Sequence, residues 1–198
     1  MTWAPDYATT AELKAYLRIG DAVDDAQIAL AVTAASRAVD RHTNRQFGLI
    51  DAPEARKYTA RWDAHLRRYV VDIADLMTVV GLTITTEAGT VDGYDLKPAN
   101  AAVESFPWTR FVVKPESLVK PSLEEDGVTV TAKYGWTTVP AAVKQATLLQ
   151  ASRFFKRRDA PFGVAGSPDV GSELRLLAKV DPDVAVALGP YMRWWGAV

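Results

Sequence analysis

The hydrophobic period of this chain changes twice, and these changes constrain the fold more than any other feature. Residues 9–45 and 137–158 place apolar side chains three or four positions apart, as amphipathic helices do. Between these segments lie about six short β-rich runs, separated by the turn-prone segments EAGTVDG, KPAN and EEDG. Because every connection between the runs is too short to hold a crossover helix, the strands are predicted to pair mostly antiparallel.

The sequence therefore predicts an α+β fold: a helical bundle of long helices with an inserted, mostly antiparallel β region and a C-terminal arm. We expect residues 1–50 and 137–160 to form the helical core and residues 51–136 to form the β-rich insertion. Residues 161–198 are expected to form the arm, in which Asp181-Pro182-Asp183 starts a short helix. A chain of 198 residues suits one domain, or a small domain with an insertion.

Local signals mark where the helices begin. Thr9-x-x-Glu12 is a capping box that predicts a first helix ending before Gly20, and a second, longer helix follows from Asp24. The apolar face of the second helix holds Ile28, Ala31, Val32, Ala35, Val39 and His42. Pro140 is suited to the first turn of a third long helix that is predicted to continue to about Arg158. The small alanines of the second helix predict close packing against another helix.

Composition excludes several classes of function. The chain has no cysteine, which removes disulfides, thiolate metal sites and cysteine nucleophiles. Its net charge is −1, whereas a protein that coats nucleic acid usually needs a strong excess of positive charge. There is no apolar run of membrane-spanning length and no signal-peptide pattern, so we expect a soluble protein made in the cytoplasm.

The sequence offers little for catalysis. A histidine-based site would have to use His42 or His65, and His42 lies on the apolar face of a predicted helix, where a core or interface position is favoured. Asp63-x-His65 could offer two metal ligands, but no third ligand converges on them, and a solvated polar turn is the favoured explanation of the pair. Nucleophile-elbow, Walker and dinucleotide-binding motifs are absent from the sequence. We therefore expect no enzyme activity, no metal and no cofactor.

The end of the third predicted helix combines two kinds of side chain. Phe154 and Phe155 fall on the stripe expected to face a core, whereas Arg153, Lys156 and Arg157 fall on the opposite side together with Ser152. Three explanations for these cations stay open: a favourable interaction with the helix dipole, a DNA-facing patch, or a protein interface.

Three stretches together resemble one family, the head–tail connector (adaptor, or head-completion) proteins of tailed bacteriophages. The first is TTAELKAYLRI followed by DAQIALAVTAASRAVDRHTNRQF, whose family-like positions are Ala34, Ala35, Val39, Asp40, Thr43, Arg45 and Phe47. The second is VTVTAKYGWTTVPAAVKQATLLQASRFFKRRD, and the third is APFGVAG followed by DPDVAVALGPYMR. They cover about half of the chain. The β region departs from the smallest, mainly helical members and is similar to longer ones.

This resemblance implies a structural protein of the virion neck, assembled in the host cytoplasm. Family members form rings, typically twelvefold, that sit beneath the portal protein, extend the DNA channel and receive stopper or tail-completion proteins. Genomic DNA passes such a ring without sequence-specific binding. The contacts that the resemblance implies with the portal or another partner are Phe162, Val164, Tyr191, Arg193, Trp194 and Trp195. The alternative from another class is a nucleic-acid-binding accessory protein that uses Arg153, Lys156 and Arg157.

Overall fold

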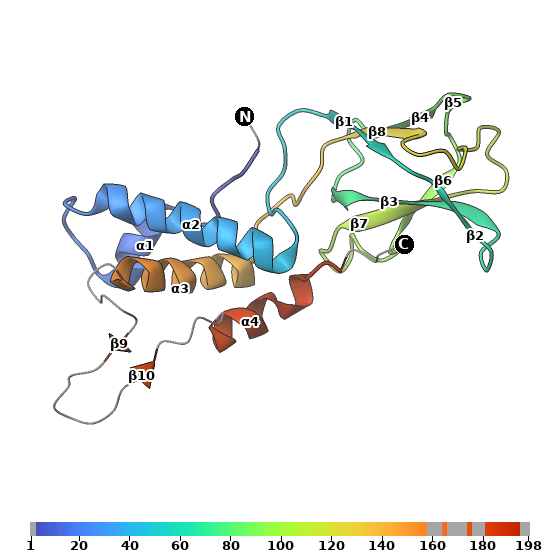
Figure 1. The fold of residues 1–198 in the computed structure, drawn as a ribbon. Helices are drawn as coiled ribbons and strands as arrows, with labels where there is room; N and C mark the ends of the chain where they lie inside the picture. Colours follow the sequence, from blue (N-terminus) through green and yellow to red (C-terminus); the bar gives the residue numbers. More distant parts are fainter. Residues whose placement is uncertain (1–2, 158–163, 166–173, 176–180, 195–198) are drawn as a thin grey trace. The chain divides into compact units, whose positions relative to one another are not determined.

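The computed structural model describes residues 3–157, 164–165, 174–175 and 181–194. The chain divides into two compact units (Figure 1). One unit, here called the helical unit, consists of Met1–Phe47 and Val139–Val198. The other, here called the β unit, consists of Gly48–Thr138. The β unit is thus inserted between two parts of the sequence that fold together.

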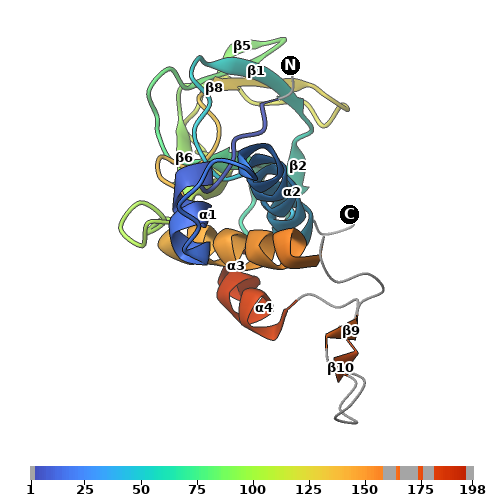
Figure 2. The same ribbon diagram turned by 90° about the vertical axis from the view of Figure 1, so that its left-hand side faces the viewer.

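The helical unit places one helix between the others. Its helices are α1 (Thr10–Leu17), α2 (Asp25–Thr43), α3 (Ala141–Arg157), α4 (Pro182–Leu188) and the short 3₁₀ helix η3 (Gly189–Tyr191). Figures 1 and 2 show α1 and α2 on one side of α3 and α4 on its other side. Two short antiparallel strands, β9 (Val164–Ala165) and β10 (Leu174–Arg175), lie between α3 and α4 in the sequence.

The predicted bundle of long helices is wrong. The four α-helices among the described residues have 8, 19, 17 and 7 residues, and the strands form a unit with two sheets of its own. The physical reason is that residues 48–138 bury a core of their own between two sheets and therefore form a separate unit. The helices themselves end close to the predicted positions. Arg18 and Asn44 take left-handed backbone conformations that end α1 and α2, and Gly189-Pro190 follows α4. Helical periodicity identified the segments, but it did not determine how much of the fold they build.

The core of the helical unit follows the predicted apolar stripe of α2. The buried residues at its centre are Leu13, Ile28, Val32, Ala35 and Ala151. The capping box of α1 is confirmed: Thr9 Oγ1 accepts the Glu12 N–H at 3.2 Å, and Glu12 Oε2 accepts the Thr9 N–H at 2.9 Å. One predicted position is wrong, because Ser152 is buried and its hydroxyl donates to the Leu149 carbonyl.

The β unit contains two antiparallel four-stranded sheets. The β8 sheet has the order β1 (Glu54–Tyr58), β8 (Val128–Ala132), β4 (Thr83–Thr86), β5 (Gly89–Thr90). The β7 sheet has the order β2 (Arg61–Asp63), β3 (Arg68–Leu76), β7 (Trp108–Val113), β6 (Tyr94–Lys97). Figures 1 and 2 both show the β8 sheet lying above the β7 sheet, so that the two form layers.

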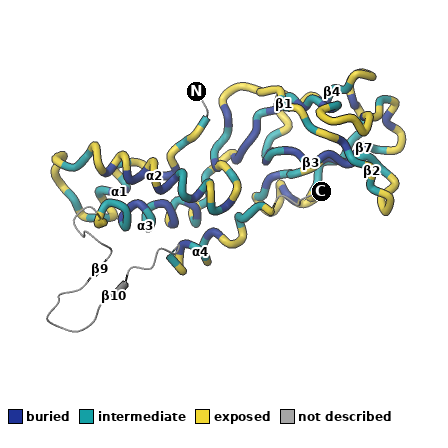
Figure 3. The backbone as a smooth tube through the Cα atoms, viewed as in Figure 1, coloured by how far each residue is buried: buried dark blue, intermediate teal, exposed yellow. Residues whose placement is uncertain are grey.

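Each sheet buries the side chains of one face, and the β7 sheet also buries Val70 and Val112 on its other face. The β8 sheet buries Ile84, Val128, Val130 and Ala132, and the β7 sheet buries Val71, Ile73, Phe111 and Val113. Figure 3 shows this burial along the strands, with exposure concentrated in the connecting turns. A hydrogen bond also joins the two layers, because the Ala74 N–H of β3 donates to the Tyr58 hydroxyl of β1. The β unit therefore has its own hydrophobic core.

The two ends of the β unit are held together by a backbone clamp. Trp136 N–H donates to the Gly48 carbonyl at 2.8 Å, and Ile50 N–H donates to the Tyr134 carbonyl at 3.1 Å. Gly135 lies between them with φ +109°, and a Cβ at this position would be only 2.0 Å from the Gly48 carbonyl oxygen. Only glycine fits this close approach. The close approach of the two chain segments therefore explains why glycine follows Tyr134 after β8.

Candidate assembly surfaces

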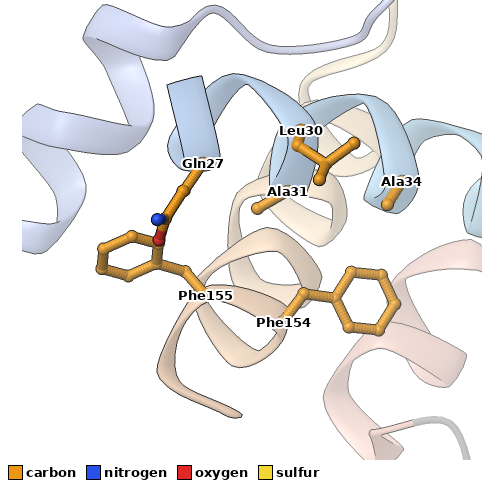
Figure 4. A pocket seen from close by; sticks show the side chains of 6 residues that line it. All are labelled: Gln27, Leu30, Ala31, Ala34, Phe154 and Phe155. Atoms are coloured by element: carbon orange, nitrogen blue, oxygen red, sulfur yellow. The ribbon is translucent and has the colours of Figure 1, made fainter. Parts of the chain in front are cut away.

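An apolar groove runs between α2 and the last turns of α3 (Figure 4). Its volume is about 430 Å³, and its lining residues are Gln27, Leu30, Ala31, Ala34, Phe154 and Phe155. Figure 4 shows the Phe155 ring beside Gln27, while the Phe154 ring points the opposite way. The groove is open because Ala31 and Ala34 of α2 have short side chains. Leu30 lies on its rim and is 69% exposed. A rim leucine of this kind is suited to a protein contact.

The segment after α4 is anchored to the end of α2. Val184 and Leu188 of α4 are buried, and the Tyr191 ring contacts Phe47 edge-on with 5.9 Å between ring centres. Arg45 Nε donates to the Tyr191 carbonyl at 2.8 Å, and Arg193 N–H donates to the Thr43 carbonyl at 2.8 Å. This part of the predicted arm therefore packs on its own helical unit.

The predicted partner contacts divide accordingly. Tyr191 and Arg193 take part in the anchor, whereas the next residue, Trp194, is 80% exposed. Val164 lies in β9, and its side chain is outside the described residues, as are Phe162 and Trp195. The anchor fixes the direction in which the chain leaves the helical unit at Trp194.

The three cations at the end of α3 do not form one patch. Arg153 Nη1 pairs with Asp181 Oδ2 at 2.8 Å, and both side chains are partly buried. Asp181 is also the N-cap residue of α4, where its Oδ1 accepts the Asp183 N–H at 2.9 Å. Lys156 and Arg157 are exposed in the last turn of α3. Arg153 thus joins α3 to α4, a role that the helical periodicity did not reveal.

The two histidines belong to different units. His42 lines a small cavity of about 50 Å³ between α2, α3 and α4, together with Val39, Gln150 and Leu188. His65 lies exposed in the β2–β3 turn, where the Leu66 and His65 N–H groups both donate to Asp63 Oδ1. These bonds hold the pKa of the Asp63 carboxyl below its usual value. In the part of the chain that the structure describes, no cluster of three His, Asp or Glu side chains could hold a metal ion.

Charged side chains on the β7 sheet form a network of ion pairs that was not predicted from the sequence. Asp72 lies between Arg61 and Arg110 at 3.4 and 3.3 Å, and Asp95 lies between Lys114 and Arg68 at 3.5 and 3.9 Å. The available signal was alternation, because Arg110-x-Val112-x-Lys114 places its two cations on one face of a strand.

The chain thus has a fold in which a helical unit is interrupted by an inserted unit of two antiparallel sheets. The sequence matches no known protein-family model and no curated protein. Within the described residues, no helix is both long and apolar enough to span a membrane.

Solved structures that contain chains with this fold include two particle necks. One is the neck of an empty gene transfer agent (GTA) particle computed with C6 symmetry, with a TM-score of 0.58. The other is the neck of a native GTA particle computed with C12 symmetry, with a TM-score of 0.55. Each match has 20% sequence identity and covers 100% of this chain and 96% of the other. The resemblance to neck proteins that the sequence indicates is therefore confirmed at the level of the fold.

Proposed function

We propose that this protein is a structural subunit of a virion neck, the region that joins the head to the tail. The observation that carries the proposal is the fold likeness to the two neck structures, which extends over both units and covers the whole of this chain. A likeness confined to one unit would leave the other free to define a different function. The role requires no catalytic site, and the protein acts through the surfaces it presents.

Within the neck, the subunits form a ring of twelve copies that extends the DNA channel beneath the portal. A cyclic ring needs a heterologous interface, in which one surface meets a different surface of the next copy. The α2–α3 groove and the exposed Trp194 supply apolar surface that the helical unit does not cover. The sixfold and twelvefold symmetries of the two similar necks are consistent with such a ring.

The portal protein contacts the C-terminal segment, and a stopper or tail-completion protein binds the other end of the ring. Trp194 is the central portal contact in this proposal, because it is exposed directly after the anchored residues Tyr191 and Arg193. Tryptophan and arginine are enriched at the energetically dominant points of protein interfaces. Phe162, Val164 and Trp195 complete the proposed contact set.

Genomic DNA passes through the ring without sequence-specific contacts. Lys156 and Arg157 remain exposed cations that could meet phosphate groups, whereas Arg153 is engaged with Asp181. This ion pair weakens the alternative of a nucleic-acid accessory protein, which needs all three cations. No specific observation favours that alternative.

Co-assembly with the portal tests the proposal. Purified chain is mixed with purified portal rings, and the product is examined by mass photometry and negative-stain electron microscopy. We expect a second ring on one face of the portal, with a mass increment of twelve subunits. A mixture that stays unassembled at micromolar concentrations would contradict the proposed function.

A further inference from the structure

One outer face of the β unit carries an excess of positive charge. The strand register places Arg61 opposite Val70, Val70 opposite Val112, and Val112 opposite Asp95, all on one side of the β7 sheet. This is the side opposite Val71, Phe111 and Val113, and its charged side chains lie around the buried Val70 and Val112. The charged residues that share this side are Arg61, Arg68, Lys97, Arg110 and Lys114, with Asp63, Asp72 and Asp95. The cations outnumber the carboxylates, so the face stays positive after its internal ion pairs are counted. We call it the cationic face.

The β8 sheet carries an acidic hollow on its own outer side. The hollow has a volume of about 420 Å³ and is lined by Lys57, Thr85, Thr86, Glu87, Glu124, Glu125, Asp126, Gly127 and Thr129. All four of its carboxylate side chains are exposed. The turn that holds three of them is tied to the end of β1, because Asp126 N–H donates to Thr59 Oγ1 at 3.0 Å.

The cationic face and the acidic hollow point in opposite directions. The two sheets form layers, and the charged side chains of the cationic face and of the acidic hollow are the solvent-accessible groups of the two sheets, so these patches lie on opposite sides of the β unit. A head-to-tail contact between identical subunits needs two different, complementary patches arranged in this way. A contact related by a twofold axis would instead bring like charges together.

We propose that neighbouring copies of this chain contact each other through their β units, with the cationic face of one copy against the acidic hollow of the next. This inference rests on the proposed ring and specifies one of its interfaces. Arginine and lysine side chains are long enough to enter the hollow, where carboxylates and the hydroxyls of Thr85 and Thr129 can accept hydrogen bonds.

The contact determines which surfaces of neighbouring subunits meet, and it contributes less to the stability of the ring. Exposed ion pairs are individually weak and are screened by salt, whereas charge complementarity selects the partner surface and raises the association rate. Apolar contacts elsewhere supply most of the affinity, and the β-unit contact makes assembly sensitive to salt.

A reciprocal charge reversal tests this interface. The hollow variant carries Glu124→Lys and Glu125→Lys, and the face variant carries Lys97→Glu and Lys114→Glu. A control carries Asp51→Lys and Glu104→Lys, which match the charge change of the hollow variant at exposed sites outside both patches. Circular dichroism and thermal unfolding establish that each variant is folded. Ring formation on the portal is then measured against protein concentration.

We expect each patch variant alone to need about tenfold more protein for half-assembly, equivalent to 1.4 kcal/mol. The control is expected to assemble like the original chain. An equimolar mixture of the two patch variants should recover assembly, because each reversed patch then meets its complement on the other variant. Normal assembly of both single variants, or failure of the mixture to recover, would overturn the inference while leaving the ring intact.

Salt provides a second measurement that needs no variant. Assembly of the original chain should weaken as sodium chloride rises from about 0.05 to 0.5 M, since screening shortens the range of the charges. A ring whose formation is independent of salt would overturn the inference. A chain that forms no ring at any salt concentration would contradict the proposed function itself.

Discussion

The indole N–H of Trp136 donates a 2.9 Å hydrogen bond to Oδ2 of Asp75, and both side chains are buried in the β unit. The backbone carbonyl of Asp75 also accepts the N–H of Gly135 at 2.7 Å. One residue at the end of β3 therefore fixes both the side chain and the backbone of the segment that closes the β unit.

Replacing Asp75 with alanine is expected to destabilise the β unit by about 1–3 kcal/mol, because a buried donor loses its acceptor. Urea unfolding followed by tryptophan fluorescence measures the change. Asp51→Ala, at an exposed position, is the matched control and should stay within about 0.5 kcal/mol of the original chain. Equal effects of the two substitutions would show that the Trp136 bond adds no stability.

Gly135→Ala is expected to destabilise the protein by about 2 kcal/mol or more. The added methyl group would approach the Gly48 carbonyl oxygen to 2.0 Å at a backbone φ of +109°, so the clamp would have to open. Gly20→Ala is the control, because nothing lies within 4 Å of a Cβ at that position. Thermal unfolding of both variants checks the prediction, which fails if Gly135→Ala is as stable as Gly20→Ala.

Tyr7→Phe is expected to weaken the helical unit by about 1–3 kcal/mol. The Tyr7 hydroxyl donates to Asp40 Oδ1 and accepts the Phe47 N–H at 3.0 Å, so its loss leaves a buried N–H without this acceptor. Burial raises the pKa of Tyr7 above its usual value, so the phenol remains a hydrogen-bond donor throughout the neutral pH range. Tyr16→Phe removes a hydroxyl from a more exposed ring and should have little effect in the same urea titration.

The link between α1 and α3 is expected to weaken in acid. Hydrogen bonds from Lys144 and from the Thr9 N–H hold the pKa of the Glu12 carboxyl below its usual value of 4.5. A depressed pKa in the folded state contributes stability that is present above pH 4.5 and is lost as the pH falls through the folded value. Glu12→Gln should remove this contribution.

Chemical unfolding at several pH values tests this expectation. The difference in stability between the original chain and Glu12→Gln should be largest near neutral pH and should shrink below pH 4.5. Burial raises the pKa of the Asp40 carboxyl, so its titration changes stability in the opposite direction to that of Glu12. Asp40 is present in both proteins, and its effect therefore cancels in the comparison. A difference that stays constant from pH 7 to pH 3 would contradict the prediction.

Leu30→Glu is expected to impair ring formation without unfolding the chain. Leu30 is exposed on the rim of the α2–α3 groove, so a glutamate there should change stability by no more than about 0.5 kcal/mol. A buried contact with a neighbouring copy would lose far more. Ala29→Glu, on the same helix outside the groove, is the control in the portal assembly assay. Normal assembly of Leu30→Glu would exclude the groove from the interface.

Sequence reasoning worked where the signal is local. The start of α1 follows from Thr9 and Glu12, which are three residues apart and cap the same turn. The strand runs were identified from their composition, but their division into two sheets was not. β1 pairs with β8, so that Tyr58 lies opposite Val128, and no local pattern reports a pairing across such a separation.

The candidate surfaces show the same limit. Helical periodicity placed Arg153 on an exposed side of α3, but Arg153 forms an ion pair with Asp181, which lies at the start of α4. Tyr191 was expected at a partner surface because of the family resemblance, and its contact with Phe47 depends on how the segment after α4 packs against the end of α2. Long-range contacts decide which charged or aromatic side chains remain available for binding.

The backbone clamp at Gly48 and Gly135 has an evolutionary consequence. Since the insertion begins and ends at hydrogen-bonded neighbours, a short turn could replace it without stretching the flanking chain. Recombination could therefore exchange this module between relatives, or delete it, while the helices persist. Lineages with and without the β unit could then share one ancestor and differ only in the segment between Gly48 and Gly135.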